Sequence, residues 1–302
     1  MPHKKVLFRA DSSSTIGTGH IMRDLVLAKK YEKKGYEILF AVRNLEGNIN
    51  HKIKEAGYQL ILLKSQSKKE LVHVIKNSKA SLLVIDHYDI TYKKEKFIKK
   101  KTNVKILSFD DTYEKHHCDI LLNHNIGADK KKYKNLVPKH CKVKCGQKYT
   151  LLRDEFYKEK KKKYKKSKHC TTVFIAMGGA DTANLNIKIL QALKKFENIK
   201  IHLVTTTANK NLKALQKYCQ KKEFISLHIN SKKIAELMAK SDVAIITPSV
   251  ILNEVIFMEL PFIAIQTANN QKEIYKYLKA NKYFLMDKFN SKQLEKLLRE
   301  VV

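Results

Sequence analysis

The chain has 302 residues, of which 43% are hydrophobic and 30% are charged, a composition typical of a folded globular protein. It leads directly into an apolar strand pattern without a signal-peptide core. No apolar run approaches the roughly 20 residues that a membrane-spanning helix needs. These features predict a soluble, cytoplasmic protein of one large or two ordinary domains, with no membrane partner.

The net charge of +32 comes almost entirely from lysine. Among the 61 basic residues the arginines are Arg9, Arg23, Arg43, Arg153 and Arg299. Base-edge and bidentate phosphate recognition favours arginine, and no aromatic–basic platform accompanies the charge. The pattern therefore argues against a specific nucleic-acid partner. A polyanion-binding protein stays open as an alternative, and it would bind with steep salt dependence and no nucleotide preference.

The five cysteines do not predict a disulfide framework, because their number is odd and no signal peptide precedes them. His140, Cys141 and Cys145 could be imagined as zinc ligands. However, the alternating Cys-Lys-Val-Lys-Cys stretch is more typical of one strand face than of a closed tetrahedral site. We therefore expect no metal and no cofactor.

Strand and amphipathic helix patterns alternate through the first half. The expected strands cover residues 4–10, 37–44, 59–64, 81–88, 105–111 and 119–125. A helix is expected from about residue 20, with Ile21, Leu25, Ala28 and Tyr31 on one stripe. Apolar runs with polar residues at their ends are typical of buried parallel strands.

A lysine-rich stretch at 158–168 interrupts the alternation and is expected to be a solvated, mobile linker. Strand patterns then resume at 171–179, 199–206, 224–230, 243–249, 262–268 and 283–287. The sequence thus predicts an α/β protein with two Rossmann-like, doubly wound parallel-sheet domains, at 1–157 and 169–302. Since ligands of such sheets bind outside the carboxyl ends of the strands, we expect the site in a cleft between the two domains.

Polar residues collect where the strands of the first half end. They are Asp11 to Ser14, Thr18 to His20, Asp86 to Tyr88, Asp110–Asp111 and Asn123 to Asn125. Turn and cap roles account for most of them, including the three serines. His20 is different, because the positive helix N-terminus disfavours an imidazolium and so favours a general base. A packing or capping role for His20 stays open.

In the second half, Met177-Gly178-Gly179 ends one strand, and its bare glycines would let a phosphate or base approach the backbone. Thr247-Pro248-Ser249 ends another strand and begins a helix, where free N–H groups can bind an anion. Glu254 follows on that helix, within reach of two ribose hydroxyls. This arrangement suits a nucleoside diphosphate. The absence of a Walker P-loop and of G-x-G-x-x-G argues against an ATPase and against a nicotinamide enzyme.

Seven motifs resemble the UDP-sugar hydrolases of pseudaminic acid biosynthesis, and the similarity covers nearly the whole chain. They are R-x-D-S-S-S-x-I-G-x-G-H-I-x-R-D at 9–24, L-x-I-D-H-Y at 83–88, K-I-L-S-F-D-D at 105–111, H-H-C-D-I-L-L-N at 116–123, C-G-x-x-Y-x-L-x-R-x-E-F-Y at 145–157, M-G-G-x-D at 177–181 and L-N-E at 252–254. The resemblance implies a MurG-like GT-B fold with the nucleotide held mainly by the second domain.

The resemblance also implies an activity: inverting, metal-independent hydrolysis of UDP-2,4-diacetamido-2,4,6-trideoxy-β-L-altropyranose to UDP and the free sugar. By the same resemblance the catalytic residues are His20, Tyr88 and Asn270. The implied substrate-binding residues are Asp11, Gly19, Arg153, Met177, Gly178, Gly179, Ser249 and Glu254. One departure from the family pattern is Val250, which follows Ser249 where a second hydroxyl is common.

Two questions stay open at this stage. A GT-B glycosyltransferase would share the fold and the UDP site and would replace water with an acceptor hydroxyl; only the segment around His20 favours hydrolysis. Asp11 is one candidate for holding the His20 tautomer. The patterns do not set the oligomeric state, and a monomer that binds a UDP-sugar is the simplest expectation.

Overall fold

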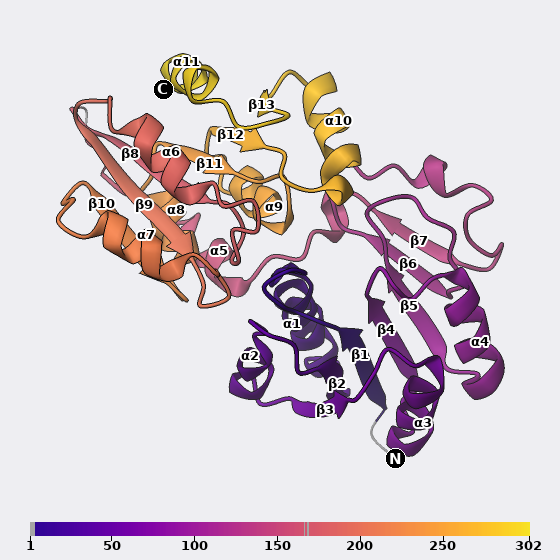
Figure 1. Ribbon diagram of the computed structural model, residues 1–302. Coiled ribbons are helices and arrows are strands. Elements are labelled where there is room, and N and C mark those ends of the chain that lie inside the picture. Colours follow the sequence, from indigo (N-terminus) through magenta and orange to yellow (C-terminus); the bar gives the residue numbers. More distant parts are fainter. Residues whose placement is uncertain (1–3, 166, 168) are drawn as a thin grey trace. The chain divides into compact units, whose positions relative to one another are not determined.

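The computed structural model describes residues 4–165, 167 and 169–302. The chain divides into two compact units, the first ending at Leu151 and the second beginning at Leu152. Each unit contains one parallel sheet covered by helices (Figure 1). The alternation of strand and helix patterns predicts this architecture.

The first unit has a seven-stranded parallel sheet in the order β3-β2-β1-β4-β5-β6-β7. Its strands are β1 (Lys5–Ala10), β2 (Glu37–Arg43), β3 (Gln59–Leu63), β4 (Leu82–Asp86), β5 (Lys105–Phe109), β6 (Ile120–Asn123) and β7 (Lys142–Cys145). Its helices are α1 (Gly19–Glu32), α2 (Asn50–Glu55), α3 (Lys68–Ser78), α4 (Tyr92–Thr102), η1 (Lys130–Tyr133) and η2 (Gln147–Tyr149).

Helices cover both faces of this sheet: α1 and α2 one face, α3 and α4 the other (Figure 1). Successive side chains of a strand point to opposite faces. Accordingly, Phe8 of β1 packs in the cluster that contains Ile21 of α1, while its neighbour Leu7 packs in the cluster that contains Ile98 of α4. Burial on both faces explains why these strands are nearly continuous apolar runs.

The second unit has a six-stranded parallel sheet in the order β10-β9-β8-β11-β12-β13. Its strands are β8 (Thr171–Ala176), β9 (Ile199–Thr205), β10 (Ile225–Ile229), β11 (Val243–Ile246), β12 (Phe262–Ile265) and β13 (Phe284–Met286). Its helices are α5 (Asp154–Glu159), α6 (Asn186–Leu193), α7 (Leu212–Cys219), α8 (Ile234–Ala239), α9 (Val250–Phe257), η3 (Asn269–Gln271), α10 (Lys272–Ala280) and α11 (Ser291–Val301).

Both sheets reverse their strand order at an equivalent place. In the first unit β1 lies between β2 and β4, and in the second β8 lies between β9 and β11. The connections on the two sides of such a switch point leave in opposite directions, so a crevice opens at the carboxyl ends of the two central strands. Each unit therefore offers a ligand site between its first and fourth strands.

The lysine-rich stretch differs from the expected mobile linker. Lys160 Nζ donates a hydrogen bond to the backbone oxygen of Phe257 (2.6 Å) and pairs with Glu259 (2.7 Å). Tyr164 donates to Glu159 of α5 (2.5 Å). The described part of this stretch is thus held by the second unit, and the division between units falls ahead of it, at 151/152 instead of after 157. Residues 166 and 168 lie outside the described part.

Across 4–165, 167 and 169–302, we find no helix with both the length and the apolar character needed to cross a membrane.

Candidate active site

His20 and Asp86 meet at the switch point of the first sheet. His20 is the second residue of α1, and Asp86 is the last residue of β4. Although 66 residues separate them in the sequence, His20 Nδ1 lies 2.6 Å from Asp86 Oδ1. A carboxylate only accepts hydrogen bonds, so this contact favours the tautomer with the ring hydrogen on Nδ1. Arg23 Nη2 also lies near this nitrogen (3.2 Å), but the Asp86 contact is the shorter of the two. The lone pair of His20 is then on Nε2, where a general base needs it.

Arg23 holds the same carboxylate from the next turn of α1. Its Nε donates to Asp86 Oδ2 (2.5 Å), and its Nη2 donates to Asp86 Oδ1. Burial raises the pKa of Asp86, but the Arg23 charge and the hydrogen bonds from Arg23 and His20 outweigh burial and hold that pKa below its ordinary value. Asp86 is therefore an ionised carboxylate that orients the His20 ring.

Tyr88 lies beside His20, as the resemblance implies for two residues of one site. The two rings meet edge to face, with centroids 5.2 Å apart. The Tyr88 hydroxyl lies 3.0 Å from each oxygen of Asp111, to which it donates. The Tyr88 side chain is 48% exposed, which makes it accessible to a ligand. Asp111, which follows β5, thereby fixes the direction of the tyrosine.

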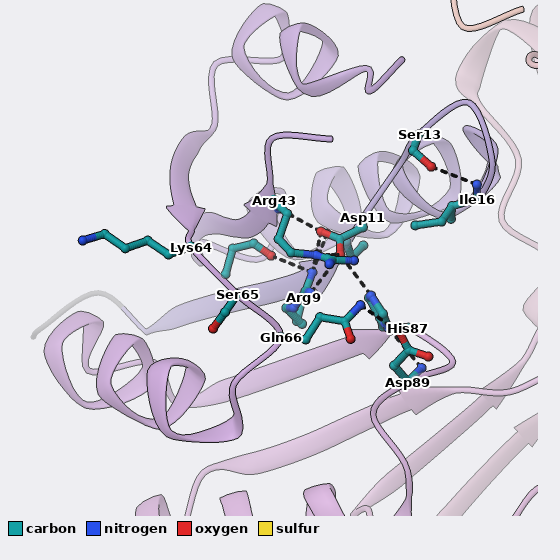
Figure 2. A network of polar contacts seen from close by, with 12 residues as sticks. Arg9, Asp11, Ser13, Ile16, Arg43, Lys64, Ser65, Gln66, His87 and Asp89 are labelled. Carbon is teal, nitrogen blue, oxygen red and sulfur yellow. Dashed lines mark hydrogen bonds and ion pairs between the residues drawn. The ribbon is translucent and has the colours of Figure 1, made fainter. Parts of the chain in front are cut away.

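Asp11 does not hold His20, contrary to the alternative considered from the sequence. Its carboxylate accepts hydrogen bonds from Arg9 (2.7 and 2.9 Å), from Arg43 Nε (2.7 Å) and from His87 Nε2 (3.0 Å), as Figure 2 shows. Burial raises the pKa of Asp11. The bonds from His87 and Arg9 lower the pKa by more than burial raises it, so the pKa lies below its ordinary value. The reason for the difference is position: Asp11 faces Arg43 at the end of β2, whereas Asp86 faces α1.

The serines after Asp11 shape the turn before α1, as expected for turn and cap residues. Ser13 Oγ accepts from the backbone N–H groups of Ile16 (2.9 Å) and Thr15 (3.2 Å) (Figure 2). Ser12 Oγ accepts from the backbone N–H of Ile49 (3.0 Å). These bonds place Gly19 at the first position of α1 and His20 directly after it.

The switch point of the second sheet brings together the two loops that the sequence singled out. Met177, Gly178 and Gly179 follow β8, and Thr247 follows β11; the backbone N–H of Thr247 donates to the oxygen of Ala176 (3.3 Å). Gly178 has a φ of +80°, a conformation that side chains with a Cβ rarely adopt. Ser249 is the N-cap of α9, and the first turn of a helix presents N–H groups that have no intrahelical acceptor.

Glu254 of α9 is buried and bound to Arg153. Arg153 Nε and Nη2 lie 3.3 and 3.1 Å from Glu254 Oε1, and its Nη1 lies 2.8 Å from Glu155 Oε1. Burial raises the pKa of Glu254, and the Arg153 charge opposes this effect. Both bonds from Arg153 fall on a single oxygen of Glu254.

Asn270 lies in η3, in the loop after β12, and its side chain is exposed. The loop is shaped by the next residue: Gln271 Oε1 accepts from the backbone N–H groups of Thr267 (2.8 Å) and Ala268 (3.2 Å). Gln271 itself is buried, so the loop that carries Asn270 is anchored to the second unit.

The sequence analysis gave no site role to Asp86, Arg23 or Asp111, although all three stand in the motifs quoted there. Asp86 and Asp111 also stand at the ends of strands expected to run parallel. The spacing of Arg23 and His20, three residues apart on one helix, puts them on the same face. Among the described residues, no three His, Cys, Asp or Glu side chains converge as a metal site would require.

Fold comparison assigns the class of protein. MurG from Acinetobacter baumannii, a solved structure, is similar over 98% of this chain and 90% of its own, with a TM-score of 0.63 and 12% identity. Together with the two parallel sheets, this similarity shows a GT-B fold, as the sequence predicted. No family model matches the sequence.

Sequence comparison assigns the family. The chain is 45% identical over 279 residues to UDP-2,4-diacetamido-2,4,6-trideoxy-β-L-altropyranose hydrolase from Campylobacter jejuni, with 92% of this chain and 97% of that protein covered. It is also 31% identical over 286 residues to the uncharacterized protein MJ1062 from Methanocaldococcus jannaschii, covering 91% of this chain and 58% of that protein. The chain belongs to the family of the Campylobacter hydrolase, which confirms the resemblance stated from the motifs.

Proposed function

We propose that this chain hydrolyses UDP-2,4-diacetamido-2,4,6-trideoxy-β-L-altropyranose to UDP and the free diacetamido sugar. The observation that carries the proposal is the His20–Asp86 pair at the switch point of the first sheet, in a chain 45% identical to that hydrolase. A base with its lone pair on Nε2 is what activation of a water molecule requires. The free sugar would enter pseudaminic acid biosynthesis.

The proposed reaction inverts the anomeric carbon. His20 Nε2 takes a proton from a water molecule on the face opposite UDP while the water oxygen forms a bond to the anomeric carbon. The anomeric C–O bond breaks, and its electron pair leaves with UDP as a phosphate anion, so a strong general acid is dispensable. Asp86 stabilises the imidazolium through the Nδ1 hydrogen. The proton passes from His20 to solvent when the products leave.

The second unit is proposed to hold UDP. Gly178 and Gly179 would let the nucleotide approach the backbone after β8, and the N–H groups at the start of α9 beside Ser249 would bind the diphosphate. Glu254 Oε2, the oxygen that Arg153 does not bond, would accept from the ribose hydroxyls. Arg153 then acts by fixing Glu254. Because N–H donors take up the phosphate charge, we propose that no metal is needed.

Tyr88 and Asn270 are proposed to orient the water molecule or the acetamido groups of the sugar. Asp11, whose carboxylate bonds Arg9, Arg43 and His87, is proposed to support the loop that ends at Gly19 instead of touching the substrate. The monomeric state and the cytoplasmic location stay predictions.

The test is a proton NMR time course with the purified protein, EDTA and the diacetamido UDP-sugar, with UDP-N-acetylglucosamine as the control sugar. We expect UDP and the free sugar to appear, with the inverted anomer first. The retained anomer would contradict the mechanism. Tight binding of the UDP-sugar without release of sugar would indicate a glycosyltransferase that lacks its acceptor.

A further inference from the structure

Arg23 is buried between the two carboxylates that orient the proposed active-site side chains. Its Nε and Nη2 bond both oxygens of Asp86, which holds His20. Its Nη1 lies 3.6 Å from Asp111 Oδ2, and Asp111 accepts from Tyr88. The Arg23 guanidinium also stacks on Phe109, 4.8 Å from the ring centroid. The Arg23 side chain is 6% exposed. One arginine thus links the partner of His20 with the partner of Tyr88.

The fork geometry of Arg23 fixes the position of the Asp86 carboxylate. A bidentate guanidinium–carboxylate pair defines both the direction and the plane of the carboxylate, which a lysine ammonium cannot do. Asp86 Oδ1 then has one remaining direction for the His20 Nδ1 hydrogen. The orientation of the imidazole, and with it the aim of Nε2, follows from this pair.

The charge of Arg23 has a second effect. A lone buried carboxylate next to a histidine favours the protonated ring, and a protonated ring cannot act as a base. A guanidinium on the same carboxylate offsets that negative charge. The titratable and charged groups that face this cluster from the elements around it are Asp86 on β4, Arg23 and Asp24 on α1, Tyr88 after β4, Asp111 after β5 and His124 after β6.

Burial shifts the pKa of two of these groups toward the neutral form. Burial and the Asp86 charge raise the pKa of Asp24, whose carboxyl oxygens have no hydrogen-bond partner among the described residues. Burial and Arg23 lower the pKa of His124 to about 3, and neither of its ring nitrogens has a partner in the described part of the chain. Among these groups, the carboxylates that Arg23 contacts are Asp86 and Asp111.

We propose that Arg23 is a positioning residue for the hydrolysis: it aims the His20 ring through Asp86, and its charge offsets that of the Asp86 carboxylate. The inference rests on the proposed function, in which His20 is the base. The inference assigns one task to the bidentate geometry of the Arg23 guanidinium and another to its positive charge. Substitutions at Arg23 can separate these two tasks.

The kinetic test measures the pH profile of kcat/KM for the UDP-sugar in four proteins. Arg23→Gln removes the charge, and we expect the acidic limb to move to higher pH by about one unit or more. Arg23→Lys keeps the charge and loses the fork, so we expect an unmoved limb and a loss of about tenfold in kcat/KM. In the double variant Arg23→Gln/Asp86→Asn both charges are absent, and the limb should return toward that of the wild type. Identical limbs in all four folded proteins would overturn the proposal.

A second measurement needs no substrate and no folded Arg23→Gln protein. Nitrogen-15 NMR of the wild type reports the tautomer of His20, whose signals among the 12 histidines are identified by their loss in His20→Asn. We expect the hydrogen on Nδ1, and in Arg23→Lys the same tautomer with a broadened ring signal. A hydrogen on Nε2 in the wild type would overturn the proposal. If the protein instead releases no sugar while His20 shows the expected tautomer, the proposed function fails, and of the inference only the orientation of His20 by Arg23 through Asp86 is retained.

Discussion

The two switch points of this protein lie at equivalent places in two sheets of the same strand order, yet they hold different chemistry. Between β1 and β4 the chain places buried charges and titratable rings, with His20, Asp86 and Arg23 in direct contact. Between β8 and β11 it places a glycine turn and the start of α9. The first arrangement can move a proton, and the second can hold an anion. One scaffold thus supports both tasks, because the crevice comes from topology and the chemistry from the loops.

The largest expected effect comes from His20→Asn. Without a base, kcat/KM should fall by ~10²–10⁴-fold, while the affinity for UDP stays unchanged because the second unit is proposed to hold the nucleotide. Sugar release followed by NMR and UDP binding followed by calorimetry separate the two effects. Equal activity of wild type and variant would leave His20 as a packing or capping residue.

Glu254→Gln should act on nucleotide binding instead. The loss of a charged acceptor for the ribose should raise the Kd for UDP by about tenfold or more, with a smaller change in kcat. Glu155→Gln is the matched control, because Glu155 pairs with the same guanidinium through Arg153 Nη1. If both variants weaken UDP binding equally, Glu254 acts by holding Arg153 and not by binding ribose.

Gly178→Ala tests whether the turn after β8 serves the ligand or only the fold. A Cβ at a φ of +80° costs about 1 kcal/mol, or a few degrees in Tm. Gly35→Ala is the control, because Gly35 has a φ of +79°, and at both positions a Cβ would meet no described atom within 4 Å. We expect similar losses in Tm, with a severalfold weaker UDP affinity in Gly178→Ala alone. Unchanged affinity would remove this turn from the site.

The smallest effect concerns stability and pH. His116 in the first unit lies between Glu95 (2.8 Å) and Asp110 (3.8 Å). Burial lowers its pKa, but the neighbouring carboxylates of Asp110 and Glu95 outweigh burial and raise it to about 10 from 6.5. The folded state then binds more protons than the unfolded state between these values, so this contribution is complete below pH 6.5 and is lost as the pH rises to 10.

The measurement is the Tm of wild type and His116→Gln between pH 6 and 10. We expect the stability advantage of the wild type to shrink as the pH rises. His228→Gln in the second unit is the contrasting variant, since burial lowers the pKa of His228. For this variant the Tm series is extended below pH 6, because the wild type should lose its relative stability as the pH falls below 6.5. A constant difference between wild type and His116→Gln at all pH values would contradict the ion-pair account.

Much of the fold could be predicted because the strands are buried on both faces. Each of the twelve strand patterns overlaps an observed strand, and the alternating Cys-Lys-Val-Lys-Cys stretch contains β7. The patterns extended too far at the carboxyl ends. Residues 87–88 and 247–249 were included in the expected strands, but β4 ends at Asp86 and β11 at Ile246, and the residues that follow form loops at the proposed site. The lysine-rich stretch was predicted as mobile on composition alone, which does not report the bonds of Lys160 to Phe257 and Glu259.

The sequence by itself determined the periodic burial that makes two parallel sheets, the glycines and hydroxyls after β8 and β11, and the position of His20 at the start of α1. Those are local properties, because side-chain period and helix-start chemistry depend on neighbours along the chain. The tertiary structure decided which carboxylate holds His20. Asp11 is near it in sequence, but Asp11 turns toward Arg43, and β4 brings Asp86 from 66 residues away to 2.6 Å. Strand order and side-chain direction determine which carboxylate bonds His20, and neither can be predicted from the spacing of these residues in the sequence.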